Sequence, residues 1–146
     1  NRRGPLAVTP HPGEMARLGG TSAGQVQAHR LETALEAARA WNAFVVLKGF
    51  RTIVAAPDGR AFVNSTGNPG MATGGTGDVL TGMLAGLTAW FGVENWDAVL
   101  GLGVYLHGLA GDLAAERRGE ISLVATDLVR ALPRAFRQTL EAIDHA

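Results

Sequence analysis

A glycine-rich stretch, Gly67–Asp78, has the composition of a phosphate-binding loop. It reads Gly67-Asn68-Pro69-Gly70-Met71-Ala72-Thr73-Gly74-Gly75-Thr76-Gly77-Asp78. Glycines let backbone amides approach a phosphate without side-chain obstruction, and the helix expected next offers its free N–H groups and positive dipole end. No Gly-Lys-Ser/Thr follows, which excludes the Walker sequence. We predict an anion site at Gly75, Thr76 and Gly77, with the hydroxyls of Thr73 and Thr76 as further donors.

Asp78 closes this stretch at the expected helix start. A helix dipole favours a negative charge there, and a carboxylate beside a bound phosphate can act as a general base or hold a metal. The alternative is that the glycines form a tight crossing between strand and helix while Asp78 caps the helix. Spacing leaves both interpretations open, and we favour the catalytic one.

Two further groups follow expected strands. Lys48, the only lysine of the sequence, comes directly after the apolar run Phe44–Leu47, at the strand end where ligands bind in open α/β sheets. His11 lies between two prolines, where a fixed imidazole can contact a substrate amide or hydroxyl, and Glu14 can bind a metal or water. The alternatives are a solvated lysine and a locally satisfied histidine with a helix-start glutamate.

The remaining polar candidates are interpreted structurally. His29, His107 and His145 have no metal-ligand spacing and are assigned to a surface helix, a buried helix and the tail. Asp112 lies in an apolar stretch, so we expect it to bond a neighbouring loop or face a rim. Asp127 reads as a first-turn acid that complements a helix dipole.

The elements that must position these groups alternate between strands and helices. The apolar run Leu6–Val8 predicts a strand, Phe44–Leu47 a buried strand, and the runs 52–56 and 61–64 a β-hairpin, so the sheet is mixed. Apolar spacing predicts helices over 14–18, 25–41, 78–91, 97–117 and 126–143, the last bent or interrupted at Pro133. In the long second helix Val26, Leu31, Leu35 and Ala38 are expected to form one face.

Bulk composition excludes several function classes. The 146 residues suit one domain, and thirteen basic residues balance thirteen acidic ones, which argues against nucleic acid or membrane partners. The absence of cysteine excludes disulfides, thiolate metal sites and cysteine nucleophiles. We therefore expect a cytoplasmic protein. The first residues, which lack an initiator Met, suggest an internal cut.

Three ordered blocks of this sequence closely resemble the ADP-dependent NAD(P)H-hydrate dehydratase family. They are Thr9–Glu14, then Leu47–Gly49 with Thr52, then Gly67–Leu80, followed by Tyr105–Asp112 and a final Ala125–Leu128. The resemblance implies an α/β fold, a ribokinase-like three-layer α/β/α sandwich with a mainly parallel sheet. Since the family domain is about twice this long, residues 1–146 are expected to be its C-terminal half.

The resemblance also implies an activity and its residues. The family restores NADH or NADPH from the S form of their hydrates, consuming ADP, or ATP in eukaryotic relatives, and leaving AMP and phosphate. Asp78 would be the base and contact the hydrated nicotinamide together with His11. The adenine nucleotide would bind at Lys48, Gly49, Phe50, Arg51, Thr52 and Gly77. Mg²⁺ is the expected counter-ion, with Glu14 as its neighbour.

Other functions remain open at this point. A vitamin-precursor or sugar kinase of the same fold could use the same loop and base, although the former tend to carry Cys at the position of Asp78 and the latter lack the His11–Glu14 block. A non-catalytic nucleotide-binding fragment or an oligomerisation scaffold is a third possibility. The expected partners are the hydrated cofactor, the nucleotide, the missing N-terminal half or another subunit, and further copies in a homo-oligomer.

Overall fold

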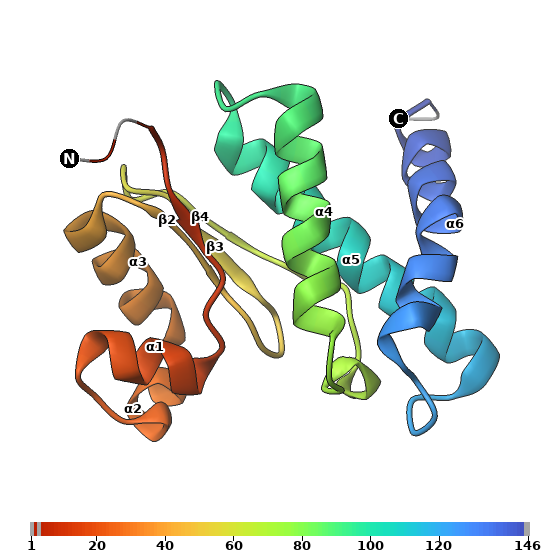
Figure 1. Cartoon of the computed structure of the whole chain (residues 1–146), viewed down its shortest axis with the longest axis horizontal. Helices are drawn as coiled ribbons and strands as arrows, with labels where there is room; N and C mark the ends of the chain where they lie inside the picture. The colour runs from red at the N-terminus through yellow and green to blue at the C-terminus, as the bar shows by residue number, and fades with distance from the viewer. Residues whose placement is uncertain (1, 3, 145–146) are drawn as a thin grey trace. The chain divides into compact units, whose positions relative to one another are not determined.

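The computed structural model describes residues 2 and 4–144, which form two compact units (Figure 1). The first unit contains the chain up to Asn64 together with Val93–Gly101. The second contains Ser65–Gly92 and the chain from Leu102 onward. His145, which the sequence assigned to a tail, lies outside the described residues.

A four-stranded mixed sheet forms the centre of the first unit. Its order is β1-β2-β3-β4, with β1 (Ala7–Val8), β2 (Phe44–Leu47), β3 (Ile53–Ala55) and β4 (Ala61–Val63). The pair β1–β2 is parallel, whereas β2–β3 and β3–β4 are antiparallel. The predicted buried strand and the predicted hairpin are therefore confirmed. A mainly parallel sheet is not what these strands form, because the hairpin contributes two antiparallel pairings.

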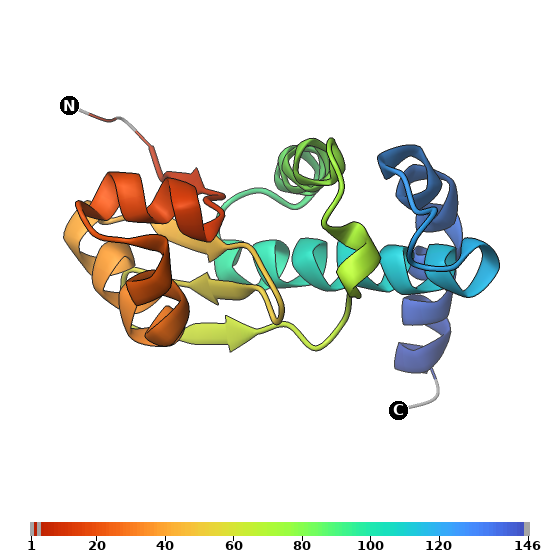
Figure 2. The same ribbon diagram turned by 90° about the horizontal axis from the view of Figure 1, so that it is seen from below.

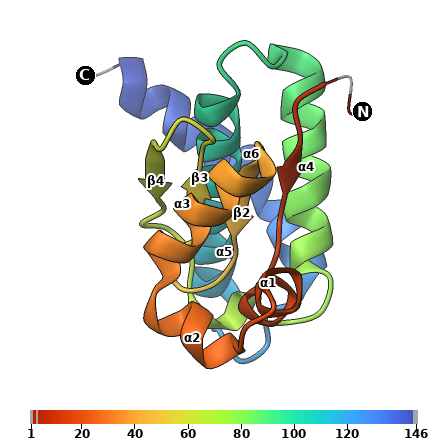
Figure 3. The same ribbon diagram turned by 90° about the vertical axis from the view of Figure 1, so that its left-hand side faces the viewer.

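Three helices cover one face of this sheet (Figures 2 and 3). They are α1 (Pro12–Gly19), α2 (Ala23–Ala28) and α3 (Arg30–Trp41). Strand side chains alternate between faces, and this face carries Val45 and Leu47 of β2 with Ile53 and Ala55 of β3. They pack with buried helix residues, namely Met15, Ala16, Val26, Ala34, Ala37 and Ala38. The small alanines allow α3 to lie close to the strands.

The opposite face is covered by the beginning of α5 (Trp96–Arg118). Phe44 meets Trp96 edge to face with ring centroids 5.2 Å apart, and Phe62 lies against Gly101. Val46 and Val54, which point the same way, are fully buried. The first unit thus contains helix, sheet and helix layers, as the α/β/α prediction requires.

The helix expected over 25–41 is two helices, so the prediction of one continuous helix was wrong. Its backbone breaks at His29, where φ is −132° and ψ is 47°, and Ser22 caps the first segment by accepting a hydrogen bond from Gln25 N. The break rotates the second segment, so that its alanines face the sheet and Leu31 is 40% exposed. The spacing of apolar residues alone does not reveal that a helix breaks and restarts with a different face toward the sheet.

The second unit is helical. It contains the 3-10 turn Pro69–Met71, α4 (Thr76–Phe91), α5 from Leu102 onward and α6 (Ala125–Asp144). Its core joins Leu106, Ala110 and Leu113 of α5 to Ala135 of α6, with Met83 of α4 packed against them. The helix α6 continues through Pro133 without the predicted interruption.

The helix α5 has the length and composition of a membrane span, but its environment is that of a core helix. Of its most apolar window, 67% is buried inside the protein. Burial by protein accounts for this hydrophobicity, as in other core helices.

Two glycines in helices of the second unit provide a test of its packing. A Cβ on Gly108 would lie 2.7 Å from the Thr66 carbonyl carbon, whereas a Cβ on Gly82 would meet nothing within 4 Å. We expect Gly108→Ala to lower the free energy of unfolding by about 1–3 kcal/mol. Gly82→Ala should instead raise it by about 0.5–1 kcal/mol, because alanine favours helix. Urea unfolding measures both, and equal effects of the two variants would contradict the close approach of α5 to Thr66.

Candidate functional site

The amino end of α4 presents backbone N–H groups that the helix does not use. Gly75 precedes the helix in the left-handed region, with φ of 87°, and no side chain caps the helix. The first i to i−4 hydrogen bond runs from Val79 N to Gly75 O at 3.1 Å. The N–H groups of Thr76, Gly77 and Asp78 therefore lie beyond the helical ladder, at the positive end of the dipole. This geometry can bind an anion.

Asp78 is the third residue of α4 and is exposed. Among the residues that the structure describes, none donates a hydrogen bond to its carboxylate or forms an ion pair with it. Asp78 therefore does not cap the helix, since the N-cap residue is Gly75. Its carboxylate is available to accept a proton or a hydrogen bond from a ligand at the same helix end.

The two hydroxyls predicted to assist the anion site need one correction. Thr76 is buried, and its Oγ1 lies 2.8 Å from Met71 O and 2.9 Å from Thr73 O. A hydroxyl has one proton to donate, so Thr76 Oγ1 serves these carbonyls of the loop. Thr76 can offer an anion its backbone N–H. The preceding turn folds back onto Thr76, which the residue types did not reveal.

The helix α5 holds the glycine-rich loop at both ends. Asp112 accepts hydrogen bonds from Gly67 N and Asn68 Nδ2, both at 2.9 Å. At the other end, His107 Nε2 lies 2.9 Å from Thr76 O. The expectation that Asp112 bonds a neighbouring loop is confirmed, and His107 is on a buried helix as predicted. These contacts satisfy the loop's polar groups on the α5 side.

The loop between α5 and α6 packs beside the glycine-rich loop. A Cβ on Gly70 would lie 2.8 Å from Glu120 Cα, so only glycine fits there. Asp127, which is 5% exposed, accepts a hydrogen bond from Val124 N and forms ion pairs with Arg118 at 3.3 Å and Arg130 at 3.2 Å. Asp127 therefore does more than complement a dipole, since it closes the 119–124 loop.

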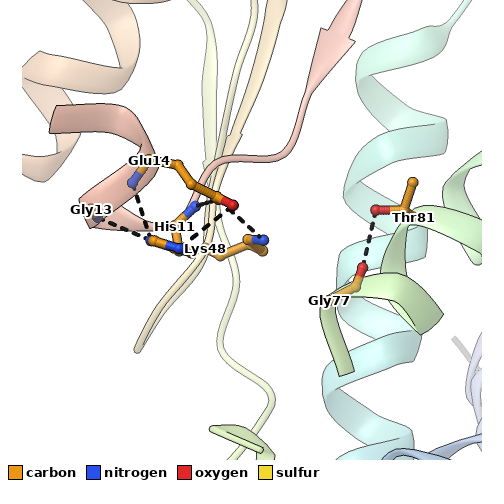
Figure 4. Close-up of polar contacts among 6 residues, drawn as sticks. All are labelled: His11, Gly13, Glu14, Lys48, Gly77 and Thr81. Carbon is orange, nitrogen blue, oxygen red and sulfur yellow. Dashed lines mark hydrogen bonds and ion pairs between the residues drawn. The ribbon is translucent and has the colours of Figure 1, made fainter. Parts of the chain in front are cut away.

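His11 and Glu14 cap α1 in the first unit (Figure 4). His11 Nδ1 accepts from Gly13 N at 3.0 Å and Glu14 N at 3.2 Å, while Glu14 Oε2 accepts from His11 N at 2.6 Å. This is a reciprocal capping box with histidine in place of serine or threonine. Nδ1 must be unprotonated to accept, so the neutral ring carries its proton on Nε2. The Nε2–H of this half-exposed imidazole lies 3.5 Å from Glu14 Oε1 and is also accessible to a ligand.

Lys48 joins this pair because β1 and β2 are parallel and their carboxyl ends are adjacent. Lys48 N donates to Pro10 O at 2.9 Å, and Lys48 Nζ lies 3.5 Å from Glu14 Oε2. The hydrogen bond from His11 N lowers the pKa of Glu14, and the charge of Lys48 lowers it further. The structure therefore brings together three of the predicted residues, His11, Glu14 and Lys48.

The segment Leu47–Thr52 forms a tight turn after β2. Gly49 has φ of 138° and Arg51 has φ of 55°, while Thr52 Oγ1 donates to Gly49 O at 3.1 Å. Phe50 is 79% exposed, with the Arg51 guanidinium 5.4 Å from its ring centroid. Arg30, which the sequence interpretation missed, donates to Leu47 O and Arg51 O. No pattern in the sequence links residue 30 to this turn.

The donor set does not fit a Mg²⁺ ion held by the protein. Within residues 2 and 4–144 no three His, Asp or Glu side chains gather into a metal site. Glu14 is occupied by His11 N and faces a lysine. Mg²⁺ binds readily through phosphate oxygens and waters, so an ion at this site would have to arrive with the nucleotide.

Comparison with known proteins gives a consistent family. A model of the NAD(P)H-hydrate dehydratase family matches residues 1–134. The bifunctional NAD(P)H-hydrate repair enzyme Nnr of Moorella thermoacetica is 54% identical over 141 residues, which are 97% of this chain and 26% of that protein. The ADP-dependent (S)-NAD(P)H-hydrate dehydratase of Bacillus subtilis is 41% identical over 137 residues, which are 94% of this chain and 49% of that protein.

Solved structures agree with this comparison. The Bacillus subtilis ADP/ATP-dependent NAD(P)H-hydrate dehydratase, co-crystallised with ATP/Mg²⁺, matches with a TM-score of 0.88 and 39% identity over 94% of this chain and 49% of that one. A ribokinase-like superfamily protein from Enterococcus faecalis matches with a TM-score of 0.75 and 34% identity, over 90% and 44% of the two chains. The ribokinase-like fold is therefore confirmed. The chain spans 26% to 49% of the length of the relatives named here.

The burial of His107, which its hydrogen bond to Thr76 O only partly offsets, predicts a pH dependence of stability. Burial lowers the pKa of His107 below its usual 6.5, so below that pH the unfolded chain binds a proton that the folded chain excludes. This contribution is complete above about pH 6.5 and is lost as the pH falls toward the lower folded pKa. His107→Gln, which keeps an N–H donor, should flatten the fall in melting temperature between about pH 7 and about pH 5.

The matched control is His29→Gln, which changes an exposed histidine at the α2–α3 junction. This variant should keep the pH slope of the unmodified chain. An unchanged slope in His107→Gln would show that His107 is not the group responsible.

Proposed function

This chain belongs to the NAD(P)H-hydrate dehydratase family, and from that premise we propose that it carries the nucleotide and phosphoryl sites of an ADP-dependent dehydratase. The reaction converts the S form of hydrated NADH or NADPH to NADH or NADPH. ADP is the phosphoryl donor, and AMP and phosphate are the products. The free amino end of α4 with the unpartnered Asp78 carboxylate is the observation that carries this proposal.

The reaction needs a base and a site for the transferring phosphoryl group. Asp78 accepts the proton of the hydroxyl on the hydrated nicotinamide ring as that oxygen bonds to the terminal phosphorus of ADP, and the bond from phosphorus to AMP breaks. The C–O bond to phosphate then breaks with its electron pair leaving on phosphate, and the adjacent ring carbon loses a proton to solvent, which restores the ring double bond. The N–H groups of Thr76 and Gly77, with the amide of Gly75, stabilise the charge of the transferring group.

The turn after β2 and the His11 cap supply the remaining contacts. We assign Lys48, Gly49, Phe50, Arg51 and Thr52, with Gly77 of the α4 loop, to the adenine nucleotide. His11 contacts the hydrated cofactor as a donor, because its Nδ1 is committed to the α1 cap. Mg²⁺, when bound, offsets phosphate charge and enters on the nucleotide.

The Bacillus subtilis dehydratase is about twice as long as the segment that this chain matches, so we expect a further polypeptide segment to complete the domain. We propose that residues 1–146 are the C-terminal portion of one ribokinase-like domain and that the N-terminal half, or another subunit, covers the exposed sheet edge at β1. A homo-oligomer and a cytoplasmic location remain our predictions. ADP, or ATP in its place, is the co-substrate.

A small-molecule kinase of the same fold is the second candidate, because the same amides and carboxylate would transfer phosphate to another hydroxyl. The family match and the His11–Glu14 block favour the dehydratase. A kinase would leave its product phosphorylated, whereas the dehydratase releases phosphate. Free phosphate formed only when hydrate is present therefore separates the two.

Replacement of Asp78 tests the assignment of the base. Asp78→Asn keeps the size of the side chain but removes its basicity, so NADH regeneration from the hydrate and ADP should fall about 100-fold or more. The increase in NADH absorbance measures the rate. Asp58→Asn, in the hairpin turn of the first unit, is the matched control and should keep full activity. Undiminished activity of Asp78→Asn would refute the assignment.

A thermal-shift titration tests the third possibility, a fragment without catalysis. ADP, AMP and the hydrate are added separately to the chain, and each bound ligand should raise the melting temperature by mass action. A response to nucleotide with none to the hydrate would refute dehydration by this chain. No response to any of them would favour the scaffold interpretation.

A further inference from the structure

Arg30 connects α3 to the turn that follows β2. It is the first residue of α3, and its partly buried Nη2 donates to Leu47 O at 3.2 Å and to Arg51 O at 3.3 Å. Its Nη1 donates to Gln27 Oε1 at 3.2 Å. One guanidinium group thus holds two carbonyls that flank Gly49, four residues apart along the chain. A planar group with several fixed donors suits such a double contact better than an ammonium.

The absence of a side chain at Gly49 leaves room for this guanidinium. A Cβ on Gly49 would overlap Arg30 Nη1 and lie 3.2 Å from Arg30 Cζ. Its φ of 138° is also a conformation that side chains rarely adopt. Arg51 has φ of 55°, which is uncommon for a residue other than glycine. The hydrogen bond from Arg30 to Arg51 O stabilises that backbone conformation.

Planar trans peptides convert these two carbonyl contacts into a fixed backbone direction. In each peptide unit the C=O and the N–H point in opposite directions. With Leu47 O held toward Arg30, Lys48 N points to Pro10 O, where it makes a 2.9 Å hydrogen bond. With Arg51 O held likewise, Thr52 N–H points away from Arg30. The guanidinium therefore orients the peptides at both ends of the turn and links the turn to the residue before His11.

The charge of Arg30 is not neutralised by a carboxylate. Arg60, Arg118, Arg130 and Arg134 each pair with an acidic side chain, but within the described chain no Asp or Glu lies in ion-pair range of Arg30. Burial lowers the pKa of Arg30, yet a guanidinium stays protonated in proteins. A positive charge therefore lies within hydrogen-bond distance of the turn's backbone, where it favours the binding of an anionic ligand.

We propose that Arg30 is a positioning residue for the adenine nucleotide: it fixes the backbone of Leu47–Thr52 and so orients Lys48 and the peptide N–H groups of the turn toward the nucleotide. This inference rests on the proposed function, which assigns the same turn to the nucleotide. It adds a residue that contacts the binding turn and not the ligand. Glycine is then required at position 49 for two reasons: its backbone conformation and the space that the Arg30 guanidinium occupies.

The experiment combines nucleotide affinity with hydrogen exchange. Arg30→Met should weaken ADP and AMP binding, measured by calorimetry, by about tenfold or more because two charge-assisted hydrogen bonds are lost. Exchange of the 48–52 amides should become faster. Arg39→Met is the matched control, since Arg39 lies on the same helix but packs against Gly59 in the hairpin turn. It should change neither the affinity nor the exchange of the 48–52 amides.

Chemical rescue separates positioning from general destabilisation. Guanidinium ion added to Arg30→Ala at low concentration should restore part of the ADP affinity, whereas sodium at equal ionic strength should not. Faster exchange of 48–52 with unchanged affinity would overturn the proposal, as would equal effects of Arg30→Met and Arg39→Met. If the unmodified chain binds no adenine nucleotide, the proposed assignment of residues 48–52 to the nucleotide is refuted. Unchanged 48–52 exchange in Arg30→Met would still refute the role of Arg30 independently.

Discussion

The hydrogen bonds from α5 to the glycine-rich loop determine what that loop can offer a ligand. Asp112 holds its beginning through Gly67 N and Asn68 Nδ2, and His107 holds its end through Thr76 O. These bonds, with the inward-facing Thr76 hydroxyl, satisfy the polar groups on one side of the loop. The N–H groups of the first turn of α4 have no helical partner, and the dipole adds to their attraction for an anion. The role proposed for Asp78 depends on this placement.

In the first unit, side chains that we propose to contact ligands also have structural roles. His11 caps α1 with Nδ1, and its Nε2 lies 3.5 Å from Glu14 Oε1. Glu14 completes the cap and lies 3.5 Å from Lys48 Nζ. The structural and functional interpretations of His11 are thus compatible, because a histidine has two ring nitrogens with separate roles. Capping also fixes the ring orientation, which an exposed loop histidine would lack.

Features fixed by local physical chemistry could be predicted from the sequence, whereas most specific tertiary partners could not. The run Phe44–Leu47 and the turn 57–60 specified β2 and the hairpin, and the cost of burying Asp112 unpaired implied a loop partner. The break at His29 escaped because apolar spacing continues across it. Arg30 escaped because its carbonyl partners lie 17 and 21 residues away, and the Thr76 hydroxyl was misassigned because its partners are backbone atoms of a folded turn.

Some glycines are required by packing, whereas Gly74 of the glycine-rich loop is not. Gly49, Gly70 and Gly108 face the Arg30 guanidinium, the Glu120 backbone and the Thr66 backbone respectively, so a side chain at any of them would collide with the protein itself. A Cβ on Gly74, in contrast, would meet nothing within 4 Å. Packing gives no reason for glycine there, whereas close approach of a phosphate to the backbone does. Gly74 thus adjoins the anion site proposed at Gly75, Thr76 and Gly77, whereas Gly70 of the same stretch is required by its packing against Glu120.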